Sequence, residues 1–221
     1  MTQTVVITGA NRGIGLALAR LYQSRGDRVF AACRQSSPGL DDIGVEVIKG
    51  IDVTREDSLQ ALQKALRGVT IDLLINNAGI LNNEKLGDLD VEAIRRQFEV
   101  NALAPLRITE RLAPQMPAGS RLALVTSRMG SLADNTSGGA YGYRMSKAAL
   151  NMAGRCLAHD LKERGIAVAI LHPGMVSTEM IGGRGDISPA EAAARLADRI
   201  DTLGLGNTGT FWHANGEVLP W

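Results

Sequence analysis

The segment TVVITGANRGIG at residues 4–15 decides the fold class. It begins with a β-branched run typical of a buried parallel strand, and apolar side chains at helical spacing follow over residues 13–25. Between them, Gly9 permits a tight turn, Gly13 lets a pyrophosphate approach the backbone, and Gly15 allows helix to pack closely on strand. The helix N-terminus offers free N–H groups to phosphate. Although glycines also occur in ordinary turns, this context predicts a dinucleotide site.

The same alternation of strand and helix patterns continues along the chain. Further strands are predicted at residues 28–33, 45–50, 71–76, 121–127 and 166–172, with an edge strand and turn within residues 209–221. Further helices are predicted at residues 55–67, 90–112, 143–164 and 188–202. We therefore expect an α/β fold, in which one doubly wound, mostly parallel sheet forms a single domain over residues 1–221.

Composition narrows the class of partner. The 221 residues carry 24 Lys and Arg against 23 Asp and Glu, so no basic surface indicates nucleic acid or anionic lipid as a partner. No apolar run approaches the roughly 20 residues of a membrane span, and the first residues lack a signal-peptide pattern. Cys33 and Cys156 show neither metal-ligand spacing nor a disulfide framework. We expect a cytoplasmic protein without a metal site.

The end of the second predicted strand indicates which cofactor is bound. An acidic residue at this place would bind a ribose 2′-hydroxyl, but the chain has Cys33 and Arg34 there. Arg34 suits a 2′-phosphate, and Arg12 in the glycine turn would add charge from the other side. NADP(H) is thus favoured over NAD(H), unless both arginines are simply solvated. Asp52 is placed to accept from an adenine amino group, or else to cap the next helix.

Tyr143 and Lys147 form the candidate catalytic pair. They lie four residues apart on one predicted helix and therefore share a face. A lysine ammonium and an oxidised nicotinamide would lower the pKa of the phenol towards working pH, so Tyr143 would act as general acid or base. Ser127 ends the strand before this helix, where its hydroxyl would polarise a carbonyl or, alternatively, satisfy local backbone groups.

Asn101 is a candidate through its backbone. Pro105 follows it by four residues within a predicted helix, and proline has no N–H to donate to the Asn101 carbonyl. We expect a kink there and a free acceptor for a water that connects Lys147 to solvent. The alternative is that Pro105 only bends the helix around the core.

Two further runs of small and polar residues lie at the ligand edge of the sheet. In NNAG, at residues 76–79, the asparagines are expected to tie neighbouring strands together, and Gly79 lets a ribose come near. In HPG, at residues 172–174, Pro173 and Gly174 turn the chain beside the nicotinamide, whereas His172 is expected to be structural. Thr178 is a possible contact of the carboxamide.

Together, TGANRGIG, NNAG, Asn101, Ser127, YRMSK and HPGMVST resemble, in order and spacing, the classical short-chain dehydrogenase/reductases over nearly the whole chain. The resemblance implies a Rossmann fold, a tetrad of Ser127, Tyr143, Lys147 and Asn101, and hydride transfer between nicotinamide and a carbonyl carbon. It extends the cofactor site to the following residues: Asn11, Ile14, Val53, Ala78 and Val176. The segment TSRMGSLADNTSGGAYGYRMSKAALN further resembles the branch with sniffer-type carbonyl reductases and C-factor-like bacterial proteins.

The chain departs from the family pattern at two places. The stretch between Ser127 and Tyr143 is longer than the commonest spacing, which makes Ser131 the alternative serine. Residues 178–188 form a short glycine-rich segment where many relatives carry a longer lid. We expect a short, mobile lid, and therefore an open pocket and broad substrate acceptance.

The sequence thus predicts an NADP(H)-dependent carbonyl reductase that acts on small carbonyl or alcohol substrates. The alternative is a cofactor-binding signalling or regulatory protein of the same fold with little catalysis. The helix that begins at Tyr143 has a wide apolar stripe, so one row is expected to pack on the sheet and another on a partner in a homodimer or homotetramer. The two predicted rows are Ala148, Met152 and Cys156, and Ala149, Ala153 and Leu157.

Overall fold

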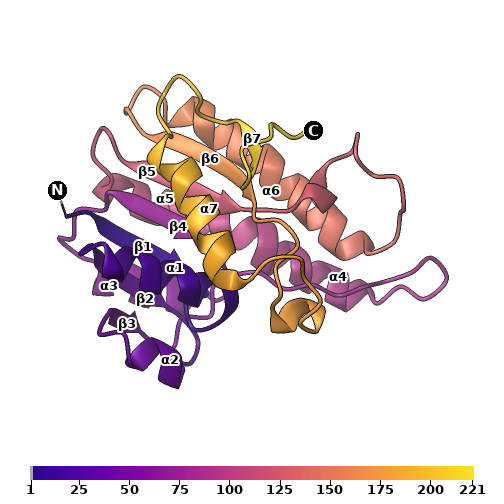
Figure 1. Ribbon diagram of the computed structural model, residues 1–221, viewed down its shortest axis with the longest axis horizontal. Helices are drawn as coiled ribbons and strands as arrows, with labels where there is room; N and C mark the ends of the chain where they lie inside the picture. The colour runs from indigo at the N-terminus through magenta and orange to yellow at the C-terminus, as the bar shows by residue number, and fades with distance from the viewer. Residues whose placement is uncertain (1) are drawn as a thin grey trace.

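A computed structural model describes residues 2–221 as one seven-stranded sheet flanked by helices (Figure 1). All neighbouring strands are parallel, in the order β3-β2-β1-β4-β5-β6-β7. The strands are β1 (Thr4–Thr8), β2 (Arg28–Ala32), β3 (Glu46–Ile48), β4 (Leu73–Asn76), β5 (Arg121–Val125), β6 (Ala167–His172) and β7 (Phe211–His213). The predicted doubly wound Rossmann fold is confirmed. The strand order reverses between β1 and β4, where open α/β sheets bind their ligands.

Helices cover both faces of this sheet. On one face, which Figure 1 shows in front, α1 (Gly13–Ser24) packs beside α7 (Pro189–Asp201), with α2 (Pro38–Asp41) near the β3 edge. On the other face are α3 (Glu56–Ala65), α5 (Ala104–Leu112) and α6 (Tyr141–Asp160), and α4 (Val91–Phe98) packs against α6. Short 3-10 turns are η2 (Ala113–Gln115), η3 (Arg128–Gly130) and η4 (Glu179–Ile181).

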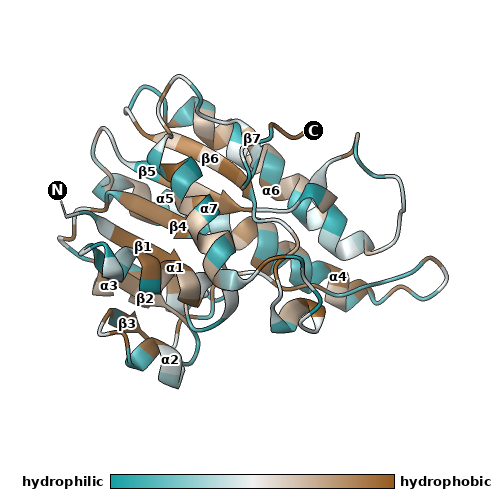
Figure 2. Cartoon of the chain, viewed as in Figure 1, coloured by the Kyte–Doolittle hydropathy of each residue, from teal (hydrophilic) through white to brown (hydrophobic). Residues whose placement is uncertain are grey.

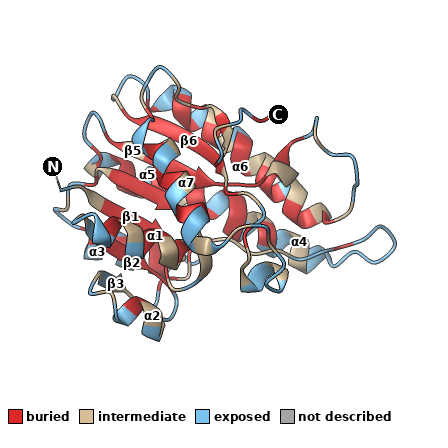
Figure 3. Ribbon diagram, viewed as in Figure 1, coloured by how far each residue is buried: buried red, intermediate tan, exposed pale blue. Residues whose placement is uncertain are grey.

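Alternate side chains of each strand supply the two cores. Val5 and Ile7 of β1 pack with Leu18 of α1, whereas Val6 between them belongs to the core that contains Leu150 of α6. The strands are accordingly apolar (Figure 2) and buried (Figure 3) along most of their length. Burial of each such side chain contributes about 1.5–3 kcal/mol to the free energy of unfolding. This double coverage explains why the strand sequences are continuous apolar runs.

The helix predicted at residues 90–112 is observed as an unbroken run over residues 91–112, with a widened turn in its middle. The structure divides it into α4, a π-helical turn η1 (Glu99–Leu103) and α5. The N–H of Ala104 donates to the carbonyl of Glu99, five residues back. Pro105 follows directly after this π-helical turn, in the first turn of α5, and has no N–H to donate back into it. The expected kink is therefore a widened turn that contains Asn101, and a free Asn101 carbonyl stays a prediction.

The two apolar rows predicted on α6 do not match its buried face. Its buried residues include Lys147, Leu150, Gly154 and Leu157, so only Leu157 of the predicted rows is buried. Met152 and Cys156 are exposed. The oligomeric state stays a prediction. Residues 2–221 hold no group of His, Cys, Asp or Glu side chains arranged for a metal ion, and none of their helices is long and apolar enough to cross a membrane.

Asn76 makes a different contact from the one predicted. Instead of tying two strands together, its side-chain N–H donates to the Thr109 hydroxyl at 3.2 Å, and this hydroxyl donates to the Pro105 carbonyl at 2.7 Å. Asn76 is 2% exposed and Thr109 is fully buried. The end of β4 is therefore joined to α5 through a buried polar contact.

We expect Thr109→Val to lower the free energy of unfolding by about 1–3 kcal/mol, because the buried Asn76 amide loses its partner. Denaturant unfolding measures the change. The control, Thr70→Val, makes the same chemical change at an exposed position and should stay within about 0.5 kcal/mol of the parent. A Thr109→Val protein as stable as the parent would show that this contact contributes nothing.

Candidate active site

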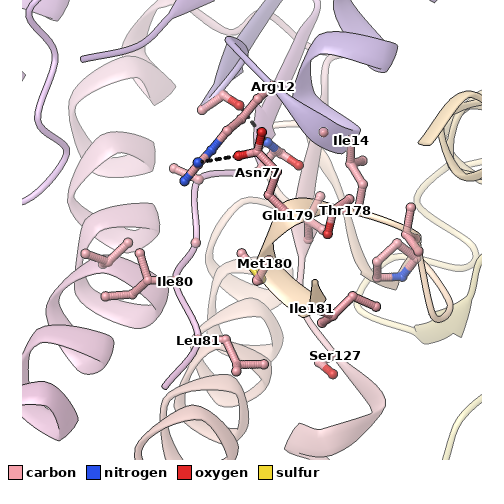
Figure 4. A pocket seen from close by; sticks show the side chains of 18 of the residues that line it. Arg12, Ile14, Asn77, Ile80, Leu81, Ser127, Thr178, Glu179, Met180 and Ile181 are labelled. Carbon is pink, nitrogen blue, oxygen red and sulfur yellow. Dashed lines mark hydrogen bonds and ion pairs between the residues drawn. The ribbon is translucent and has the colours of Figure 1, made fainter. Parts of the chain in front are cut away.

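A cleft of about 1230 Å³ opens at the carboxyl edge of the sheet (Figure 4). It is larger than an ordinary small-molecule pocket and has room for a dinucleotide beside a substrate. All predicted site residues line it except Gly15 and Asn101, which lie behind its wall. Those on the cleft are Gly9, Asn11, Arg12, Gly13, Ile14, Arg34, Asp52, Val53, Asn77, Ala78, Gly79, Ser127, Tyr143, Lys147, Pro173, Gly174, Val176 and Thr178.

The glycine turn is a cradle that side chains would fill. Gly9 and Gly13 have φ of 66° and 53°, in the left-handed region that favours glycine. A Cβ on Gly9 would lie 2.8 Å from Cα of Ala78, and one on Gly15 would lie 2.2 Å from the Gly9 carbonyl oxygen. Gly15 therefore packs directly against the backbone of Gly9, so the first turn of α1 lies close to the end of β1. Gly13 and Ile14, the first two residues of α1, line the cleft. The N–H groups at a helix start have no partner within the helix, so this end of α1 suits a phosphate.

Asn77 joins the ends of β1 and β4. Its side-chain N–H donates to the carbonyls of Thr8 and Gly9 at 3.1 and 3.2 Å. In return, the Thr8 hydroxyl accepts from the backbone N–H groups of Asn77 and Ala78 at 3.1 and 3.2 Å. These four bonds fix the floor of the cleft at the point where the strand order reverses.

The far end of the cleft carries the residues expected near the adenosine. Arg34 is exposed at the end of β2. Oδ1 of Asp52 accepts from the N–H and the hydroxyl of Thr54 at 3.0 and 2.8 Å. Burial pushes the pKa of Asp52 upwards, but the Thr54 bonds and the charge of Arg34 outweigh it, so the pKa lies below the ordinary value. The helix-capping alternative is wrong, because Arg55 is the N-cap of α3.

Arg12 points to a different partner from the one predicted. Its guanidinium forms an ion pair with Glu179 of η4 at 2.8 Å (Figure 4). The two side chains are 64% and 79% exposed, so the pair contributes at most about 1 kcal/mol. Arg12 therefore joins the glycine turn to the opposite wall of the cleft in this conformation.

Tyr143 and Lys147 lie on the first turns of α6 and are buried. Lys147 Nζ donates to the Val125 carbonyl at 2.9 Å and lies 5.7 Å from the centre of the Tyr143 ring. Burial lowers the pKa of Lys147 to about 8 and raises that of Tyr143, while the Ser127 hydroxyl opposes the rise. In the protein alone the expected lowering of the Tyr143 pKa is therefore absent, and the phenol is neutral at pH 7.

The two candidate serines occupy different places. Ser127 lines the cleft beside Tyr143, and its oxygen accepts from the N–H of Met129 at 3.1 Å. Ser131 is 2% exposed, lies off the cleft and accepts from the N–H of Asp134 at 3.1 Å. The geometry favours Ser127, and the longer stretch before Tyr143 is accommodated in a surface loop.

Both polar atoms of the Asn101 side chain form hydrogen bonds within the protein. Its Oδ1 accepts from the N–H of Ile80, and its Nδ2 donates to the Ile80 carbonyl, both at 2.9 Å. Nδ2 also donates to the Ser146 hydroxyl at 3.0 Å, and this hydroxyl donates to the Tyr143 carbonyl at 2.8 Å. Any catalytic role of Asn101 therefore rests on its backbone carbonyl.

Sequence reasoning missed several residues around the cleft. Ser146 was detectable, because it is a polar residue on the same helical face as Tyr143. The apolar side chains that line the substrate end carry no such signal, since sequence does not show which surface residues turn inwards. They include Leu81, Met129, Met175, Met180 and Ile181.

The predicted lid is a compact loop. The N–H of Ser177 donates to the Ile187 carbonyl at 2.9 Å, and the N–H of Asp186 donates to the Met175 carbonyl at 2.7 Å. A Cβ on Gly185 would lie 2.2 Å from the Ser177 nitrogen, so the loop needs glycine there. Its mobility stays a prediction.

His172 ends β6 on the cleft and packs edge-on against His213 of β7, with ring centres 4.8 Å apart. Burial, with a smaller contribution from His213, lowers the pKa of His172 to about 3. Its Nδ1 is buried and has no hydrogen-bond partner within residues 2–221. The imidazole is therefore neutral over the physiological range.

This environment makes folding stability depend on pH. Between its folded pKa of about 3 and its ordinary value of 6.5, His172 binds a proton only in the unfolded chain, so stability falls as pH drops below 6.5. We expect His172→Gln to reduce the stability loss between pH 6.5 and 5 by about 1–2 kcal/mol, measured by denaturant unfolding. His159→Gln, at an exposed site on α6, should leave the loss unchanged. Equal pH profiles for all three proteins would contradict the argument.

Comparison with known sequences identifies relatives of this chain. The family model for short chain dehydrogenase matches residues 3–186. A 1-hydroxy-2-glutathionyl-2-methyl-3-butene dehydrogenase from Rhodococcus sp. (strain AD45) is 43% identical over 224 residues, which cover 99% of each chain. The C-signal protein of Myxococcus xanthus is 46% identical over 154 residues, which cover 68% of this chain and 93% of that protein.

Solved structures agree with these sequences. The carbonyl reductase Sniffer of D. melanogaster has a TM-score of 0.92 at 28% identity, with 100% of both chains covered. A carbonyl reductase from Pseudomonas aeruginosa PAO1 in complex with NADP has a TM-score of 0.88 at 35% identity, again over 100% of both chains.

Proposed function

Because the chain belongs to the short-chain dehydrogenase family, we propose that it transfers a hydride between NADP(H) and a small carbonyl or alcohol substrate. The observation that carries the proposal is the meeting of Ser127, Tyr143 and Lys147 at the cleft whose other end is the glycine turn. Bound NADPH supplies the hydride for reduction. The broad substrate acceptance expected from the short lid belongs to the same proposal.

The cleft fits this cofactor in this chain. The left-handed glycines at positions 9 and 13 leave room for a pyrophosphate at the start of α1. Arg34 is proposed to bind the 2′-phosphate, and the free Oδ2 of Asp52 the adenine amino group. Ala78, Gly79 and Thr178 line the cleft. The first two are proposed to contact a ribose, and Thr178 the carboxamide. The NADP complex of the Pseudomonas aeruginosa carbonyl reductase supports the assignment.

We assign the proton transfer to Tyr143. Its phenol donates a proton to the carbonyl oxygen in reduction and accepts one in oxidation, while Ser127 donates a hydrogen bond to the same oxygen. Burial keeps the phenol protonated, which suits reduction. Lys147 shares the buried space and is proposed to return the proton, through a water at the Asn101 carbonyl.

The second candidate is a signalling or regulatory role with little catalysis, which the similarity to C-signal favours. A binding protein has no need for a buried Tyr and Lys beside Ser127, so the site argues for the enzyme. Loss of turnover in Tyr143→Phe with the biological role unchanged would favour the signalling role.

The first experiment measures oxidation of NADPH by a panel of aldehydes and ketones and, in the oxidative direction, reduction of NADP⁺ by alcohols that include glutathione conjugates. We expect Tyr143→Phe to lower kcat by about 10²–10⁴-fold, because it removes the proton donor, while NADPH binding followed by nicotinamide fluorescence changes little. Binding without turnover by the parent on every carbonyl would contradict the reductase. Equal turnover by parent and variant would contradict the role of Tyr143.

Cofactor choice is tested at Arg34. Because a charged hydrogen bond contributes about 1.5–3 kcal/mol, Arg34→Ala should weaken NADPH binding by about 10- to 100-fold and leave NADH binding nearly unchanged. Arg67→Ala removes the same charge at an exposed site and should bind NADPH as the parent does. Tighter binding of NADH than of NADPH by the parent would overturn the NADP(H) assignment.

A further inference from the structure

A buried carboxylate lies at the start of the helix that carries Tyr143. Glu84, in the loop between β4 and α4, is only 5% exposed, which is rare for an acidic side chain. Its Oε1 accepts from Gln97 Nε2 at 2.6 Å, and its Oε2 accepts from the N–H of Gly142 at 3.1 Å. Its backbone carbonyl accepts from the N–H of Ala140 at 2.9 Å. Glu84 thus accepts hydrogen bonds from Ala140, the N-cap residue of α6, and from Gly142 in its first turn.

This first turn lacks a cap of its own. Ala140 is the N-cap residue, and an alanine has no side-chain acceptor for the first N–H groups. It has φ of 45° and is the one non-glycine residue within residues 2–221 in the left-handed region, a conformation that costs about 1–2 kcal/mol. The side chain of Glu84 therefore replaces the missing cap, and its charge suits the positive end of the helix.

The third element at this junction is α4. Gln97 is fully buried, and its Oε1 accepts from the N–H of Asn82 at 2.9 Å, so both ends of its amide are used. A Cβ on Gly142 would lie 2.3 Å from Gln97 Nε2, so only glycine fits between the helices. The loop that follows β4 therefore packs tightly against both α4 and α6.

Tyr143 follows Gly142 directly in the chain, whereas Ser127 follows β5 and is the N-cap residue of η3. The relative position of the two hydroxyls thus depends on where α6 begins. From this geometry we infer that Glu84 is a positioning residue, which places Tyr143 by fixing the first turn of α6. The inference rests on the proposed role of Tyr143 as proton donor. If Tyr143 has that role, its misplacement by about 1 Å should lower the rate by about 10²-fold.

The hydrogen-bond pattern allows a reciprocal test. Glu84→Gln directs an N–H₂ group at the N–H₂ group of Gln97, and Gln97→Glu directs two carboxylates at each other. The double variant restores every bond. Gln at position 84 then donates to Glu at position 97 and accepts from Gly142, and Glu at position 97 still accepts from Asn82.

We expect each single variant to lower kcat by about 10- to 100-fold, with the affinity for NADPH nearly unchanged, and the double variant to return to within about threefold of the parent. Ser120→Ala is the control, since it removes a buried hydrogen bond to the Ile71 carbonyl at the opposite edge of the sheet. It should lower stability but not kcat. If either single variant does not fold, Glu84→Asp, which keeps the charge and shortens its reach, replaces it.

A second readout does not depend on turnover. The chain has three tyrosines, so the ¹³Cζ signal of Tyr143 can be assigned by its loss in Tyr143→Phe. This signal should shift in both single variants and return in the double variant. A parent without turnover, but with this shift and its recovery, would contradict the proposed function and keep the positioning role. Single variants with parent kcat and an unshifted signal, or a double variant that regains stability alone, would overturn the inference.

Discussion

The close approach of the β1 and β4 ends is the constraint on which the site depends. Gly9 passes so near Ala78 that a Cβ on Gly9 would be 2.8 Å from the Cα of Ala78. Four hydrogen bonds join Thr8 and Gly9 on one side of the gap to Asn77 and Ala78 on the other. Because the strand order reverses there, the helices that follow β1 and β4 leave on opposite faces and a cleft remains between them. The glycine turn, the floor of the cleft and the start of α1 follow from this contact.

Burial sets the chemistry at the other end of the cleft. It raises the pKa of Tyr143 and lowers that of Lys147 to about 8, because a dry site disfavours the charged form of each group. The neutral imidazole of His172 follows from the same cause. The protein alone thus presents a protonated phenol, and the positive charge of an oxidised nicotinamide is expected to lower its pKa.

The sequence predicts most of the fold because its signals are local. A strand followed by a glycine turn and an amphipathic helix specifies the first unit, and the later units repeat its apolar pattern. Two findings were not predictable for one reason. The Asn76 to Thr109 contact and the cap that Glu84 gives to α6 both depend on partners brought together by tertiary packing. Glu84 in particular lies in an irregular loop, where a glutamate is ordinarily solvated.

Hydride transfer itself is the most direct measure of the central claim. NADPH labelled with deuterium on one face of the nicotinamide, and separately on the other, is incubated with a carbonyl substrate, and the product alcohol is analysed by mass spectrometry. The account predicts one deuterium at the former carbonyl carbon from one label and none from the other, because the cleft binds the cofactor in a single orientation. Alcohol without deuterium from either label, or no alcohol from any carbonyl, would contradict it.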